Sequence, residues 1–158
     1  MDTPSTRVDD ACRLFTDRYS CSQAVFTAFA PSFGIAPAQS LRLSAALGGG
    51  IRAGGACGAV LGALLVLGLA GCDEECTPES RHAVMALVDT FNARFRERVG
   101  SLDCPGILGY DVMIPGQRAI VQEQGLRESR CLQAVRTAAE ILEELLQGSE
   151  RPAVRTLC

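Results

Sequence analysis

The sequence contains no lysine and no tryptophan, and it has a single histidine, His82. Without lysine, the chain can form no Schiff base on an amine and has no phosphate-binding lysine of the Walker type. Aromatic residues make up only 5%, too few for a surface on which nucleobases or sugars stack. His82 falls in the first turns of a predicted helix, where a solvated side chain is the expected state. The candidate chemistry is therefore carried by groups other than amines and imidazoles.

Charge of either sign is modest and is not clustered. All 15 basic residues are arginine, 18 residues are acidic, and the net charge is −3. This balance argues against binding to nucleic acid or to an anionic membrane surface. The first ten residues are polar and acidic, without the basic and apolar regions of a signal peptide. We therefore expect a cytoplasmic protein whose thiols stay largely reduced.

Hydrophobic residues are abundant, at 47% of 158 residues, and predict one folded domain over 1–158 with its core in about 6–147. The longest uncharged run, 53–72, reaches the length of a membrane span. Six glycines interrupt that run, so a buried helix inside a bundle is favoured over a span.

Apolar residues recur at helical spacing and no segment alternates like a strand, which predicts an all-α protein. We expect a bundle of about six helices around a central glycine-rich apolar helix. The predicted helices cover about 6–18, a stretch from Cys21 or Ser22 to Pro31, 38–47, a stretch after Cys57, 78–99 and 128–147. Residues 101–127 are predicted as loops and short helical turns. Gly58 and Gly62 share a helix face and permit close approach of another backbone.

Cysteine is the anomaly of the composition. The eight cysteines stand at positions 12, 21, 57, 72, 76, 104, 131 and 158. No Cys-x2-Cys pair occurs, so the usual zinc-ribbon and ferredoxin patterns are absent, and there is no motif for covalent haem. Cys57 follows the glycine-rich segment 48–55 and begins a helix, where free N–H groups and the helix dipole favour a thiolate. Arg52 is expected to add to this effect.

Three further cysteines carry weaker local signals. Cys104 precedes Pro105, which favours a position at the cap of a short turn. Cys21 and Cys131 lie on the apolar faces of their predicted helices, where a buried thiol is the ordinary interpretation.

The remaining cysteines are expected to lie outside a functional site. Cys72 and Cys76 flank three carboxylates, 73–75, and the pair is a disulfide, a partial metal site or two unrelated surface thiols. Cys12 is expected in the core. Cys158 ends the chain and is expected to have no role.

Together these residues resemble a known family. The segments Cys21-Ser22-Gln23-Ala24-Val25 and Cys57-Gly58-Ala59-Val60-Leu61-Gly62, the glycine-rich lead-in, Cys104 and Cys131 are similar to the C-GCAxxG-C-C family of redox-active proteins. The resemblance extends from about Val8 to Leu146. It implies that Cys21, Cys57, Cys104 and Cys131 are the functional set, acting as catalytic thiols or as ligands of a metal or cofactor. A related domain accompanies haem and an iron–sulfur centre in split-Soret cytochromes, which implies a cluster as one alternative.

Three functions follow as hypotheses. The first is a thiol-dependent redox protein, an oxidoreductase that uses the four cysteines with an unidentified redox partner. The second is a module without catalysis that binds a [2Fe–2S] cluster or zinc. The third is a structural or membrane-associated helical protein in which every cysteine serves packing. A homo-oligomer is compatible with all three hypotheses. Within the first hypothesis we expect the four sulfurs to lie near one another and Cys57 to react first.

Overall fold

The computed structural model describes residues 6–72 and 74–147, and Cys158 lies outside this part. The described residues form eight α-helices and no β-strand, so the all-α prediction is confirmed. The helices are α1 (Arg7–Thr16), α2 (Cys21–Phe29), α3 (Pro37–Ser44), α4 (Gly58–Gly71), α5 (Pro78–Val99), α6 (Cys104–Leu108), α7 (Pro115–Glu123) and α8 (Leu132–Gln147). Short 3-10 turns cover Ala30–Phe33, Ala45–Leu47 and Gly50–Arg52, and a π-helical turn covers Arg127–Cys131.

Local capping signals explain where the long helix α5 begins and ends. Thr77 accepts a hydrogen bond from the Ser80 amide, and Pro78 occupies the first helical position. Gly100 ends the helix in the left-handed region, at φ +98°. These bounds agree with the predicted ones.

The stretch 101–127 is more helical than predicted. It contains α6, whose five residues match the expected short turn, and α7, which is a nine-residue helix. Pro115 opens α7 without a side-chain cap. The two proline-led helices account for the difference between the eight observed helices and the six that periodicity suggests.

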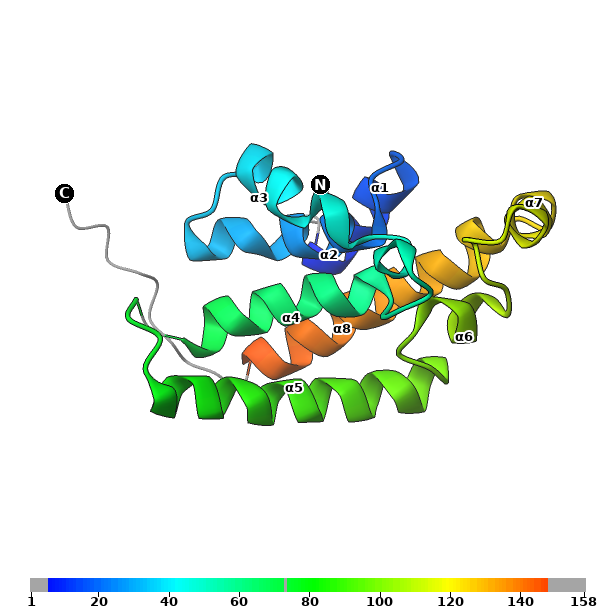
Figure 1. Cartoon of the computed structure of the whole chain (residues 1–158). Helices are drawn as coiled ribbons and strands as arrows, with labels where there is room; N and C mark the ends of the chain where they lie inside the picture. Colours follow the sequence, from blue (N-terminus) through cyan, green and yellow to red (C-terminus); the bar gives the residue numbers. More distant parts are fainter. Residues whose placement is uncertain (1–5, 73, 148–158) are drawn as a thin grey trace.

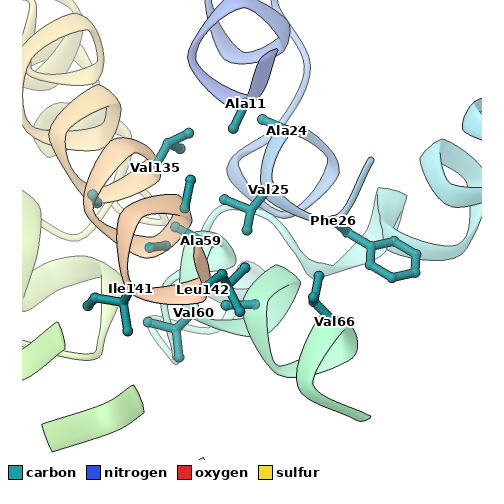
Figure 2. Packing of buried hydrophobic residues seen from close by; sticks show 14 of the residues in the cluster. Ala11, Ala24, Val25, Phe26, Ala59, Val60, Val66, Val135, Ile141 and Leu142 are labelled. Atoms are coloured by element: carbon teal, nitrogen blue, oxygen red, sulfur yellow. The ribbon is translucent and has the colours of Figure 1, made fainter. Parts of the chain in front are cut away.

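Helix α4 contacts α2, α5 and α8 (Figure 1). Its buried side chains meet those of α1, α2 and α8 in one apolar core, in which small residues such as Ala11, Ala24 and Ala59 lie beside larger aliphatic ones (Figure 2). Helix α5 covers the side of α4 and α8 opposite α2 (Figure 1). The small residues of the core, such as Ala24 and Ala59, allow the axes of α2 and α4 to approach closely.

The closest approach is between α2 and α4. A Cβ atom on Gly62 would lie 2.7 Å from the carbonyl oxygen of Ser22, and one on Gly58 would lie 3.1 Å from the Ser22 amide nitrogen and 3.2 Å from Cys21 Cβ. The distance at Gly62 leaves no room for a Cβ atom, and the two distances at Gly58 would require the neighbouring atoms to shift by a few tenths of an ångström. The predicted close approach at these two glycines is confirmed.

The apolar run of α4 ends after fourteen residues. Across residues 6–72 and 74–147, no helix combines the length and hydropathy needed to span a bilayer.

We expect Gly62→Ala to lower the free energy of unfolding. The added methyl group meets backbone rather than a flexible side chain, and overpacking of this kind costs about 1–3 kcal/mol. The better helix propensity of alanine offsets about 1 kcal/mol of that cost. Gly68→Ala in the same helix is the matched control, because no atom lies within 4 Å of its added Cβ. Urea unfolding should show the control unchanged or more stable, and equal effects of both substitutions would refute the close-approach argument.

Candidate functional site

One cavity of about 450 Å³ collects the four cysteines that the sequence places in one set. Cys21, Cys57, Cys104 and Cys131 all line it, from the starts of α2, α4 and α6 and from the turn that precedes α8. Three apolar side chains, Phe15, Leu108 and Val121, contribute to its wall. The four cysteines therefore meet at one cavity, as expected from their place in one set.

A polar network fixes the start of α2 and therefore Cys21. Ser20 and Gln23 form a reciprocal capping box, in which each side chain accepts from the other's backbone amide. The side-chain amide of Gln23 also donates, through Nε2, to the Leu41 carbonyl at 2.9 Å. The buried Ser22 hydroxyl donates to the Ser44 carbonyl at 2.9 Å. Helix α2 is thus tied to α3 on one side while it lies against α4 on the other.

A short backbone bridge holds Cys57 and Cys104 side by side. The Cys57 amide donates to the Leu102 carbonyl at 2.8 Å, and the Cys104 amide donates to the Gly55 carbonyl at 2.9 Å. These bonds flank an isolated antiparallel bridge between residues 56 and 103. Two cysteines far apart in sequence therefore start their helices next to each other.

The glycine-rich segment reaches this bridge through a left-handed turn. Gly49, Gly50, Ile51 and Arg52 all have positive φ, between +51° and +66°. A Cβ on Gly50 would lie 2.9 Å from Cys104 Cβ, so glycine is required there on both conformational and steric grounds. For Ile51, a β-branched residue, the left-handed conformation is strained.

Cys21 acts as a shared hydrogen-bond donor among the thiols. Hydrogen bonds to Cys131 and Cys57, together with burial, raise its pKa well above the ordinary thiol value. Cys21 therefore stays protonated, and its single S–H can stabilise a negative charge on either neighbour.

Cys57 is the N-cap residue of α4 and has a lowered pKa. The thiol of Cys21 is the largest cause, burial opposes it, and the amides of Ala59 and Val60 lower the pKa further. The helix-start prediction for Cys57 therefore has the right direction. Its cause differs in part, because the dominant contribution comes from a neighbouring thiol and not from Arg52.

Cys131 has a lowered pKa as well, although its predicted position on an apolar helix face indicated an ordinary buried thiol. The Cys21 thiol is again the largest cause, burial opposes it, and the nearby cation of Arg127 lowers the pKa further. Cys131 ends the π-helical turn that Arg127 begins, and both side chains line the cavity. Turns of this type are frequent at functional sites. No local sequence signal marks this one.

Cys104 differs from the other three. Burial and the nearby thiols of Cys57 and Cys131 raise its pKa to about 12. The predicted cap position is wrong by one residue, since Asp103 is the N-cap of α6 and accepts from the Gly106 amide at 2.7 Å. An aspartate is the better cap because its carboxylate is a stronger acceptor than a thiol.

The other described cysteines lie away from the cavity. Cys12 is buried, and burial raises its pKa. Cys72 and Cys76 are joined by a disulfide, with their Cα atoms 4.8 Å apart, which selects one of the three alternatives for this pair. His82 is exposed on α5, as expected.

The cysteines of the cavity, all of them among the described residues, do not form a recognisable metal site. In the part of the chain that the structure describes, no three His, Cys, Asp or Glu side chains are placed so that they could hold one metal ion. The arrangement of the four cysteines fits hydrogen-bonded thiols better than a common set of ligands.

Sequence reasoning missed most of the charged wall of the cavity. Four arginines line it, Arg18, Arg52, Arg118 and Arg127, together with the carboxylate of Glu128. The exclusive use of arginine as the basic residue was the available signal, but it does not indicate which arginines meet.

A family model matches residues 19–145, and its description is "Putative redox-active protein (C_GCAxxG_C_C)". The matched range contains all four cavity cysteines and most of the chain. The protein belongs to the C_GCAxxG_C_C family. No curated protein and no solved structure shows significant similarity to the chain.

We expect Cys57 and Cys131 to be alkylated at lower pH than Cys104 in the reduced protein. Their lowered pKa values leave a thiolate at a pH where Cys104, with a pKa of about 12, is fully protonated. Mass-spectrometric mapping of brief iodoacetamide labelling across a pH series measures each site.

The variant Cys21→Ala removes the shared donor, so the labelling profiles of Cys57 and Cys131 should move to higher pH. Cys21→Ser retains a hydroxyl donor and should move them less, while Cys12→Ala, outside the cavity, should leave them in place. Unchanged profiles in Cys21→Ala would contradict the donor role.

Proposed function

We propose that the protein is a cytoplasmic thiol–disulfide oxidoreductase whose reacting groups are the four cysteines of the cavity. The observation that supports this proposal is that Cys21, Cys57, Cys104 and Cys131 line one cavity, in which the neighbouring Cys21 thiol lowers the pKa of Cys57 and of Cys131. Thiol exchange needs an attacking thiolate and a neighbouring sulfur that resolves the mixed disulfide. Family membership supports redox chemistry in general.

In the first step, the Cys57 thiolate attacks one sulfur of a substrate disulfide. A new bond joins Cys57 to that sulfur, the substrate S–S bond breaks, and the other half leaves as a thiolate. The cavity gives the substrate access to Cys57, whose side chain is otherwise buried in the protein.

In the second step, Cys21 transfers its proton to the Cys131 thiolate and attacks Cys57. The Cys21–Cys57 disulfide forms, and the remaining substrate half leaves as a second thiolate. Two electrons pass from the protein to the substrate, and the proton of Cys21 is retained on Cys131. Cys131 is thus the base that makes Cys21 a competent resolving thiol.

Cys104 is assigned a supporting role in this scheme. Its raised pKa opposes attack, and it lies close enough to Cys57 and Cys131 for their charges to be felt. As a buried neutral neighbour it helps to exclude water from the reacting sulfurs.

The protein for this test carries Cys72→Ser and Cys76→Ser, because that pair would otherwise form a second disulfide. We expect the reduced protein to release two thiols for each small disulfide consumed and to gain one internal disulfide. The Cys21→Ala variant of the same protein should release one thiol and retain the other half as an adduct on Cys57, because the resolving sulfur is missing. Ellman-type thiol counting and intact-mass measurement give both numbers, and Cys12→Ala should behave as the parent protein. Release of two thiols by Cys21→Ala would show that Cys21 is not the resolving residue.

The two alternatives predict different results in the same material. An anaerobically purified protein with stoichiometric iron or zinc, lost on substitution of Cys57, would replace this proposal with the metal- or cluster-binding module. Reduced, folded protein in which none of the four thiols reacts with a disulfide would favour a purely structural role.

A further inference from the structure

The wall of the cysteine cavity carries an excess of positive charge. Its four arginines come from four separate segments, the turn after α1, the left-handed turn, α7 and the π-helical turn, and Glu128 is the one carboxylate among the lining residues. The chain as a whole has a net charge of −3. The positive charge at this cavity is therefore a local feature and does not follow from the overall composition.

Two of these arginines are held by the protein itself. Arg127 donates to the carbonyls of Phe15 and Tyr19 at 3.2 and 3.1 Å, and its guanidinium lies 4.0 Å from the centre of the Phe15 ring. Arg118 donates through Nε to the Val112 carbonyl at 2.8 Å. Neither forms an ion pair with a described carboxylate, so their charge remains available to the cavity.

The other two arginines, Arg18 and Arg52, have no side-chain hydrogen bond or ion pair to any residue in 6–72 or 74–147. Both have left-handed backbones, with φ +77° and +58°. A non-glycine residue in this region costs on the order of 1–2 kcal/mol, and such strain is concentrated at ligand-binding positions. Two unpaired cations are thus presented to the cavity at a cost in backbone energy.

The size and the remaining lining restrict the ligand. A volume of about 450 Å³ lies within the range of small-molecule sites, and much of the wall is apolar, including Ile107 and Met113. Separated guanidinium groups bind carboxylates through charge-assisted hydrogen bonds, and an apolar wall accommodates the methylene groups between them.

We infer that the cavity selects small disulfides that carry carboxylate groups, with Arg18 and Arg52 as the binding residues. This inference rests on the proposed function, since the cysteines supply the reaction and the arginines supply only selection. The thiolates of Cys57 and Cys131 would otherwise repel an anionic substrate. The arginines offset that repulsion and hold the substrate beside the reacting sulfurs.

The test compares three small linear disulfides that differ in net charge. They are 3,3′-dithiodipropionate (dianionic), 2-hydroxyethyl disulfide (neutral) and cystamine (dicationic). Reduced protein that carries Cys72→Ser and Cys76→Ser, which removes the dithiol outside the cavity, should be oxidised at least about tenfold faster by the dianion than by the neutral compound at low salt. Its oxidation by the dication should be slowest. Added salt should reduce the difference, because these charges are screened beyond about 10 Å at 0.1 M.

Arg18→Gln and Arg52→Gln should each lower the dianion rate several-fold more than they lower the neutral rate. Arg81→Gln, an exposed arginine of α5 outside the cavity, removes the same charge from the whole protein and should change neither rate. The ratio of variant to parent rates cancels the intrinsic reactivity of each disulfide. If all three variants kept the same ratio of dianion rate to neutral rate, the assignment of the two arginines as binding residues would be overturned.

A redox-inert dianion separates this inference from the proposed function. Suberate has the chain length of dithiodipropionate without the disulfide, and it should bind wild-type protein in a calorimetric titration and slow alkylation of Cys57. Suberate binding without reaction of any disulfide would refute the redox proposal and keep the anion site. Reaction of all three disulfides at similar rates, with no suberate binding, would overturn the anion site and keep the redox proposal.

Discussion

The contact between α2 and α4 is the constraint on which the site depends. Gly58 and Gly62 let the backbone of α4 lie directly against Ser22, and this places Cys21 at the same cavity as Cys57, whose pKa it lowers. Because a Cβ atom at Gly62 would lie too close to the Ser22 carbonyl, the same contact that packs the core also positions the cysteines of the cavity. Fold and site share one structural requirement.

The thiols of the cavity are unequal because protons and burial are unequally distributed among them. Cys21 keeps its proton, and its S–H lowers the pKa of Cys57 and Cys131. Burial and the negative charge of nearby thiolates both raise the pKa of Cys104. An attacking thiolate, a resolving thiol and a base can thus be supplied by one residue type. A protein with no lysine and an exposed lone histidine has no need of either for this chemistry.

Local signals in the sequence predicted the fold well and the site in part. Helix α5 was predicted with its observed bounds, because Thr77, Pro78 and Gly100 act within their own turns. The resemblance identified the cysteines that meet. The lowered pKa of Cys131 could not be predicted, since its causes are the Cys21 thiol from the other end of the chain and the cation of Arg127, which begins a π-helical turn without a sequence signature. The cavity arginines were missed for the same reason, as tertiary contacts alone bring them together.

The most direct test of the account is an NMR titration of the reduced protein labelled with ¹³C at the cysteine Cβ atoms. An ordinary cysteine thiol titrates near pH 8.5. The account predicts that Cys57 and Cys131 titrate below that value while Cys21 and Cys104 titrate above it, and that the two groups remain distinct until the protein unfolds. Four similar titrations above pH 8.5, as expected for independent buried thiols, would contradict it.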